Sequence, residues 1–215
     1  LKVLDQNLSK FSFLRDVLAR IQRQGRVIDA RDIVSASEFG DFETGLAIGD
    51  ISISASALTD GLVDESSFYP LLYKTFEEAR STIVIFSGFF TPKRVAEVLR
   101  VLRQHLQKGV KVKFVVPTNL TNGSLGQKDP DASASLVASI RSTGIVVEQR
   151  KSLHQKAVMI DHDLAWVGSL NPLSFAERTL ESMLLVRQPG IALQLANALS
   201  LPGSPKRTSM RDWIE

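Results

Sequence analysis

The sequence contains no cysteine, and among its 215 residues there are only three histidines and three methionines. Without cysteine the protein has no disulfide framework, no thiolate nucleophile and no cysteine-ligated zinc. Its longest apolar runs, such as 83–86, are far shorter than the ~20 residues of a membrane-spanning helix. No basic segment followed by an apolar stretch opens the chain, so no export signal is visible. We therefore expect a cytoplasmic protein without a membrane segment.

The composition is that of a folded domain. Hydrophobic residues make up 44% of the chain and charged residues 23%, which excludes disordered, collagen-like and coiled-coil proteins. The formal net charge is +3 and the sequence pI is about 9.3, a balance that modestly favours an acidic partner such as nucleic acid. Because the chain begins at Leu1 rather than Met, we expect a domain taken from a longer protein.

From residue 66 onward the hydrophobic pattern is regular. It predicts helices near 66–79, 92–108, 136–140 and 191–199, and strands at 82–86, 110–116, 145–148, 157–160, 164–167 and 184–186. Strands that alternate with helices predict an α/β domain with a mixed, mostly parallel sheet and helices on both faces. We expect residues 1–65 to form an N-terminal helix and a connector, 66–200 the main domain, and 201–215 a flexible tail.

One segment carries residues suited to chemistry. It reads His154-Gln-Lys156 and, further on, Gly168-Ser169-Leu-Asn171. In an extended strand the side chains of His154 and Lys156 point to the same face, and an imidazole beside an ammonium suits an anionic pocket rather than a core. Gly168 permits close backbone approach, while Ser169 and Asn171 add a hydroxyl and an amide. Together these groups predict a phosphate site.

With Asp161 included, these residues match the pattern His-x-Lys-x4-Asp-x6-Gly-Ser-x-Asn without a gap, and the sequence resembles the phospholipase D superfamily. The resemblance covers roughly residues 66–200 and is similar to the single-motif bacterial endonucleases of that superfamily. The form Gly-Ser-Leu-Asn-Pro-Leu-Ser is similar to nuclease domains located C-terminal to bacterial superfamily-1 helicases. The resemblance implies a phospholipase D-like layered fold and a metal-independent phosphodiesterase that needs no cofactor.

The resemblance also implies roles for the polar residues of the motif. His154 is expected to be the nucleophile that forms a covalent phosphohistidine, and, in a partner subunit, the general acid for the leaving group. Lys156, Ser169 and Asn171 are expected to hold the phosphate oxygens and to neutralise developing charge.

Four further residues receive expectations from the same resemblance. Glu181 stands ten residues after the motif asparagine and fits the carboxylate that orients the catalytic imidazole. Because this spacing varies in the family, Glu177 is the alternative. Asp161 and Gly168 belong to the motif but are expected to be structural.

The implied mechanism needs two histidines, whereas the chain has one motif. His105 lies in a predicted helix and His162 in a turn, and neither is followed by a lysine two residues on. We therefore expect a homodimer that combines two copies of His154 across a twofold axis.

The expected function is cleavage of DNA, single- or double-stranded, by the nuclease module of a helicase-associated or defence protein. A helicase domain on the same parent chain is an expected partner, and a membrane is not. Two alternatives remain open. One is a phospholipid-directed phosphodiesterase of the same superfamily, and the other is a catalytically silent module for nucleic-acid binding or dimerisation.

Two other features admit both a functional and a structural interpretation. A set of basic residues forms either a nucleic-acid surface or solvated element faces: Lys93, Arg94, Arg100, Arg103, Lys108, Lys111 and Lys113. Phe89 and Phe90 follow a predicted strand at its C-terminal end, where α/β sheets place their sites. Either phenylalanine can stack on a nucleobase, although we expect at least one to pack in the core.

Overall fold

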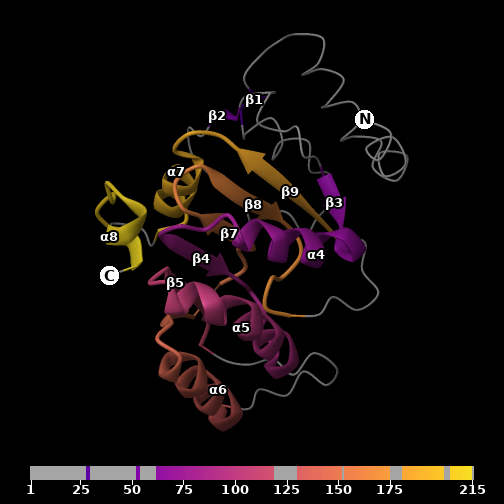
Figure 1. Cartoon of the computed structure of the whole chain (residues 1–215), viewed down its shortest axis with the longest axis vertical. Coiled ribbons are helices and arrows are strands. Elements are labelled where there is room, and N and C mark those ends of the chain that lie inside the picture. The colour runs from indigo at the N-terminus through magenta and orange to yellow at the C-terminus, as the bar shows by residue number, and fades with distance from the viewer. Residues whose placement is uncertain are drawn as a thin grey trace.

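The computed structural model describes residues 28–29, 52–53, 62–118, 130–151, 153–174, 181–200 and 204–214. Its main sheet has seven strands in the order β3-β9-β8-β7-β4-β5-β6 (Figure 1). These are β3 (Leu62–Asp64), β4 (Thr82–Phe86), β5 (Lys111–Pro117), β6 (Val146–Arg150), β7 (Ala157–Ile160), β8 (Leu164–Gly168) and β9 (Ser182–Arg187). A separate antiparallel pair joins β1 (Ile28–Asp29) to β2 (Ser52–Ile53).

The sheet is mixed, as expected, but the expectation that it is mostly parallel is wrong. Only β4, β5 and β6 run parallel, and helices α5 (Pro92–Gln107) and α6 (Pro130–Ser142) lie between them in the chain. The other four pairings are antiparallel. Only residues 161–163 connect β7 to β8, and a parallel neighbour would need a crossover of a dozen or more residues.

Helices cover both faces of the sheet, which confirms the predicted layers. Alternate strand residues such as Ile83 and Ile85 pack on α4 (Glu65–Phe76), α5 and α6. The intervening Val84 and Phe86 face the other way, against α7 (Ile191–Ala198) and α8 (Met210–Ile214). A strand buried on both faces reads as a continuous apolar run, and all five residues of β4 are buried.

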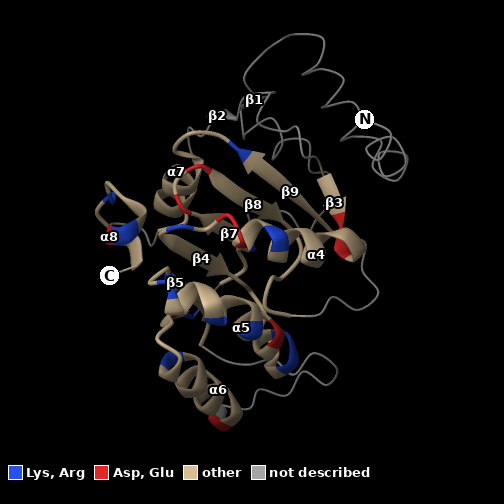
Figure 2. Ribbon diagram, viewed as in Figure 1, with Lys and Arg blue, Asp and Glu red and all other residues tan. Residues whose placement is uncertain are grey.

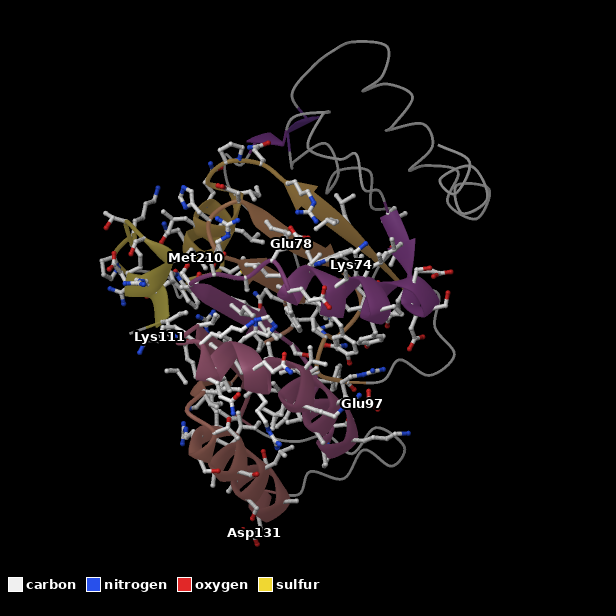
Figure 3. All side chains as sticks on the ribbon, in the orientation of Figure 1. Lys74, Glu78, Glu97, Lys111, Asp131 and Met210 are labelled. Carbon is white, nitrogen blue, oxygen red and sulfur yellow. The ribbon has the colours of Figure 1, made fainter. Side chains whose placement is uncertain are left out.

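The ordered core extends beyond the predicted limits of the domain. Strand β3, which lies before residue 66, pairs with β9. In the segment expected to be a flexible tail, Met210, Trp213 and Ile214 are buried (Met210 is labelled in Figure 3). Their spacing places all three on one face of a helix, and that face packs on the sheet. The helix predicted within residues 1–65 lies outside the described residues.

The helix starts follow local capping chemistry. Helix α5 begins at Pro92, as predicted. Its N-cap is Thr91, whose side chain accepts a hydrogen bond from the backbone N–H of Arg94. The N-cap of α4 is Asp64, whose carboxylate accepts hydrogen bonds from the backbone N–H of Ser67 and the hydroxyl of Ser66.

Candidate active site

Four of the predicted site residues lie next to strand ends that meet at one edge of the sheet. His154 and Lys156 directly precede β7, and Ser169 directly follows β8. Glu181 directly precedes β9. Because β7, β8 and β9 are antiparallel neighbours, the start of β7 lies beside the end of β8, which lies beside the start of β9. The end of β4 is next to the start of β7. The strand expected to carry His154 and Lys156 therefore begins just after them, at Ala157.

His154 and Lys156 are in direct contact. The Nε2 atom of His154 lies 3.0 Å from Nζ of Lys156, and the His154 side chain is exposed. An ammonium can only donate hydrogen bonds, so we assign the Nε2 lone pair as the acceptor and place the imidazole proton on Nδ1. This tautomer leaves the basic nitrogen of His154 on the side of the lysine.

Gly168 allows β8 and β9 to approach closely before Ser169. A Cβ atom at residue 168 would overlap the carbonyl oxygen of Ser182 and would lie 2.8 Å from Cα of Met183. The backbone N–H of Ser169 donates to that same carbonyl at 2.9 Å, and its hydroxyl accepts from the N–H of Ser182 at 3.1 Å. The hydroxyl of Ser169 is thereby held at the edge that carries Lys156.

The segments that carry Asn171 and His154 pack together at Gly88, a residue outside the motif. The Oδ1 atom of Asn171 accepts a hydrogen bond from the backbone N–H of Phe89 at 3.0 Å, which orients the amide nitrogen away from Phe89. A Cβ atom on Gly88 would lie 3.3 Å from both Asn171 Oδ1 and His154 Cα. The missing side chain of Gly88 thus allows the two motif segments to come together.

The segments 87–91 and 171–174 are joined by several further hydrogen bonds. The buried hydroxyl of Ser87 accepts from the N–H of Leu173 at 3.2 Å and donates to the carbonyl of Phe89 at 2.5 Å. The N–H of Thr91 donates to the carbonyl of Leu173 at 2.8 Å, beside a parallel bridge between Phe90 and Leu173. Two segments far apart in the sequence therefore support the position of Asn171 together.

Tyr69 and Arg94 lie beneath the segment that carries Asn171. The hydroxyl of Tyr69 lies 2.7 Å from the carbonyl oxygen of Ser174 and 3.1 Å from that of Asn171. Burial raises the pKa of the Tyr69 phenol despite the opposing charge of Arg94, so the phenol stays a donor. Arg94, expected on the surface, is buried, and it pairs with Glu97 at 2.7 Å (Glu97 is labelled in Figure 3).

No sequence motif pointed to Gly88 or Tyr69. The available signals were the Ser-Gly-Phe-Phe segment directly after a buried strand and an aromatic residue on the apolar face of α4. Neither pattern specifies a contact with residues more than 80 positions away in the chain.

Asp161 lies at the opposite end of β7, about 15 Å along the strand from Lys156. Its carboxylate accepts hydrogen bonds of 2.8 Å from the backbone N–H groups of Arg80, Ser81 and Thr82. Burial raises the pKa of Asp161, but these hydrogen bonds outweigh burial and lower it. Asp161 therefore holds the start of β4 and does not contact the His154 edge.

The remaining candidates occupy separate places. Glu181 is partly buried at the site edge, and its charge is close enough to Tyr69 to raise the pKa of that phenol. Glu177 lies outside the described residues. His105 is buried within α5, and burial lowers its pKa. His162 is exposed in the turn between β7 and β8, at the end of the sheet away from His154.

Two of the seven basic residues lie inside the protein rather than on its surface. Arg94 and Lys113 are buried, and Lys113 pairs with Glu148 at 3.0 Å. The other five residues of the predicted basic set are exposed. Figure 2 shows Lys and Arg distributed over α4, α5, α6 and α8.

Within the described ranges no group of three or more His, Asp or Glu side chains is placed to hold a metal ion. None of the described helices combines the length and the apolar character needed to cross a membrane.

Comparison with known families identifies the class. A family model described as cardiolipin synthase, PLD-like domain, matches residues 72–200, more than half of the chain. The chain belongs to this phospholipase D-like family of phosphodiesterases. No curated protein matches it.

The solved structures that are similar to the chain include Nuc and NucT. One is a phospholipase D family member, Nuc from Salmonella typhimurium, at 21% identity and a TM-score of 0.47, over 60% of this chain and 82% of that one. The other is NucT from Helicobacter pylori, at 19% identity and a TM-score of 0.40, over 59% of this chain and 84% of that one.

Proposed function

We propose that this protein is a metal-independent phosphodiesterase that cleaves DNA with His154 as the nucleophile. The observation that carries the proposal is the 3.0 Å contact between Nε2 of His154 and Nζ of Lys156. A nucleophilic imidazole needs a free lone pair at the reacting nitrogen, and the phosphate that it attacks needs a cation beside its oxygens. The neighbouring Ser169 and Asn171 supply further hydrogen-bond donors at the same edge.

In the proposed reaction Nε2 of His154 attacks phosphorus, so that an N–P bond forms while the P–O bond to the leaving strand breaks. Lys156 moves from the imidazole to a non-bridging oxygen, which Ser169 and Asn171 also contact. Glu181 accepts the Nδ1 proton in a hydrogen bond and stabilises the charged ring. A second histidine, initially protonated, gives its proton to the leaving oxygen. It then takes a proton from the water that breaks the N–P bond, which returns both imidazoles to their starting states.

The second histidine is proposed to be His154 of another copy of the chain. The sequence has three histidines, and the other two are poorly placed for this role. His105 is buried in α5, and His162 lies at the opposite end of β7. We therefore expect equilibrium sedimentation at micromolar concentration to give a homodimer. A strictly monomeric protein that retains full activity would contradict this part of the proposal.

DNA is the proposed substrate because of the formal net charge of +3 and the basic pI, together with the single motif. The Gly-Ser-Leu-Asn-Pro-Leu-Ser form of residues 168–174 supports a place as the nuclease module of a helicase-associated or defence protein. A lipid-directed phosphodiesterase is the second candidate, because the description of the matching family model names cardiolipin synthase.

The decisive experiment is cleavage of supercoiled plasmid and labelled single strands in excess EDTA. Wild type is compared with His154→Ala and with His162→Ala, the matched control at the other end of β7. We expect wild type and His162→Ala to cleave equally, and His154→Ala to be slower by about a thousandfold or more. Cleavage that persists in His154→Ala would refute the proposed nucleophile, and cleavage abolished by EDTA would refute metal independence.

The same proteins distinguish the alternatives. Release of headgroup from phosphatidyl vesicles, without any DNA cleavage, would favour the lipid substrate. DNA binding that survives His154→Ala, with no turnover of DNA, RNA or lipid by wild type, would favour a silent binding module. Such binding should weaken steeply with salt, because contacts to phosphates release counterions.

A further inference from the structure

Phe89 is an exposed aromatic residue beside the candidate active site. Phe89 is 41% exposed, whereas the neighbouring Phe90 is 2% exposed. Among the described residues the other exposed large hydrophobic side chains are Leu71 and Val146, so Phe89 is the aromatic member of this set. Single exposed apolar residues are common on protein surfaces. The position of Phe89, rather than its exposure alone, therefore carries the inference.

The backbone of Phe89 contacts the residue proposed to hold phosphate. Its N–H donates to Asn171 Oδ1 at 3.0 Å, so its Cα lies within about 4.5 Å of that oxygen. The preceding Gly88 packs against Cα of His154. Phe89 itself therefore contacts the segment of Asn171, and the residue before it contacts the segment of His154.

The segment that carries Phe89 is held on both sides. Before it, the hydroxyl of Ser87 bonds to the carbonyl of Phe89 itself. After it, Phe90 and Thr91 pair with Leu173 through a parallel bridge and a 2.8 Å hydrogen bond. An exposed ring on a backbone ordered in this way loses little conformational freedom when it binds a ligand.

We propose that Phe89 forms a stacking subsite for the nucleobase adjacent to the scissile phosphate, and that the preferred substrate is single-stranded. This inference rests on the proposed function, because it places a phosphodiester at His154. An aromatic ring stacks on the face of any base and contributes affinity without reading sequence. In a duplex both faces of each interior base are covered by neighbouring bases, so only an unpaired strand offers a free face to Phe89.

The test measures binding and cleavage separately. Fluorescence anisotropy gives the Kd of a labelled single strand and of an abasic strand with the same sugar-phosphate backbone. The variants are Phe89→Ala, Phe89→Trp and, as the matched control, Val146→Ala on β6 at the far edge of the sheet. All are placed in the His154→Ala background so that the strand stays intact. Thermal unfolding checks that each variant is folded.

We expect Phe89→Ala to weaken binding of the base-containing strand by about tenfold. Its affinity for the abasic strand should change by less than about twofold. Phe89→Trp should restore the affinity, and Val146→Ala should leave it unchanged. The slope of log Kd against log salt should be the same in all variants, because the phosphate contacts are kept. An equal loss on both strands, or no loss on either, would overturn the subsite.

Cleavage assays with an intact His154 then separate this inference from the proposed function. Wild type should cleave the single strand faster than the duplex, and Phe89→Ala should reduce that preference. Equal cleavage of single strand and duplex by wild type would overturn the single-strand preference, and an equal loss on both in Phe89→Ala would overturn the role of Phe89 in it. Base-dependent binding without any His154-dependent cleavage would retain the stacking contact and refute the proposed hydrolysis. A loss of binding to phosphatidylglycerol vesicles in Phe89→Ala, with strand binding unchanged, would identify Phe89 as a lipid contact and overturn the inference.

Discussion

The guanidinium carbon of Arg94 lies 3.5 Å from the centroid of the Tyr69 ring, and both side chains reach the carbonyl oxygen of Ser174. The Tyr69 hydroxyl lies 2.7 Å from that oxygen and Nε of Arg94 lies 3.4 Å from it. A cation over an aromatic face in a buried setting is a favourable contact. This pair ties α4 and α5 to the segment that follows Asn171.

Tyr69→Phe tests the pair as a support for Asn171. The change removes the hydroxyl from two backbone carbonyls while the ring beneath Arg94 is kept. We expect a loss of about 1–2 kcal/mol in the free energy of unfolding, measured by urea denaturation. We also expect a lower kcat with little change in KM, because the proposed phosphate ligand is displaced rather than removed. Tyr73→Phe on the same helix is the control, and an equal loss of kcat there would contradict the prediction.

Gly88→Ala tests the close packing between the two motif segments. The added Cβ would meet the carbonyl oxygen of Leu153 at 3.2 Å and both His154 Cα and Asn171 Oδ1 at 3.3 Å. These distances are shorter than ordinary van der Waals contacts, so the segments must move apart by a few tenths of an ångström. We expect cleavage to slow by about tenfold or more, while the variant still shows a thermal unfolding transition and is therefore folded. Unchanged cleavage kinetics would show that the packing at Gly88 tolerates a methyl group.

Asp161→Asn tests whether Asp161 stabilises the fold, as its position away from the candidate active site predicts. The folded-state pKa of Asp161 is lowered, so its stabilisation is present above the unfolded pKa, which is about 3.9, and is lost as the pH falls through the folded value. We expect Asp161→Asn to cost about 1–3 kcal/mol at neutral pH. The difference in stability from wild type should narrow as the pH falls below the unfolded pKa of Asp161. Urea unfolding across this pH range measures it, with Asp131→Asn, exposed on α6, as the control.

Glu148→Gln tests the ion cluster beneath α8. The carboxylate of Glu148 lies 2.6 Å from Nε of Arg150 and 3.0 Å from Nζ of Lys113, and Lys113 also donates to the carbonyl of Trp213 at 2.9 Å. Burial raises the pKa of Glu148, but the hydrogen bonds and charges of Arg150 and Lys113 lower it overall. Its stabilisation is therefore present above the unfolded pKa and is lost as the pH falls through the folded one.

We expect Glu148→Gln to cost about 1–3 kcal/mol in the free energy of unfolding at neutral pH, and to change the tryptophan fluorescence through Trp213. The control is Glu78→Gln, which breaks an exposed pair with Arg187 of 2.7 Å (Glu78 is labelled in Figure 3). An exposed pair contributes at most about 1 kcal/mol. Equal losses of stability in the two variants would contradict the larger contribution expected of Glu148.

Much of the fold was predictable because its signals are local. The apolar run of β4 spans the predicted residues 82–86, and α5 begins at the predicted Pro92. The direction of β7, β8 and β9 was not predicted correctly. The alternation of strands and helices suggested parallel crossovers, whereas the short turn at 161–163 reverses the chain. The spacing of Met210, Trp213 and Ile214 is typical of one face of a helix. A segment this short does not indicate, from the sequence alone, that it packs on the core.

The candidate site divides in the same way. The spacing of His154 and Lys156 predicts side chains on one side of an extended segment, and their contact depends only on neighbouring residues. The contributions of Gly88 and Tyr69 depend on contacts between segments more than 60 residues apart. No local pattern specifies which phenylalanine of the pair after β4 is buried.

The sequence by itself determined the class of the protein and the polar side chains of its motif. The motif spacing and the hydrophobic periodicity of strands and helices are both properties of residues close together in the chain. Tertiary structure alone decided that β7 to β9 run antiparallel, which gathers the strand ends beside His154. It also decided that Phe90 is buried while Phe89 faces solvent. The physical reason is that hydrogen bonding between distant strands and burial against distant side chains depend on which surfaces meet, and a one-dimensional pattern does not record those surfaces.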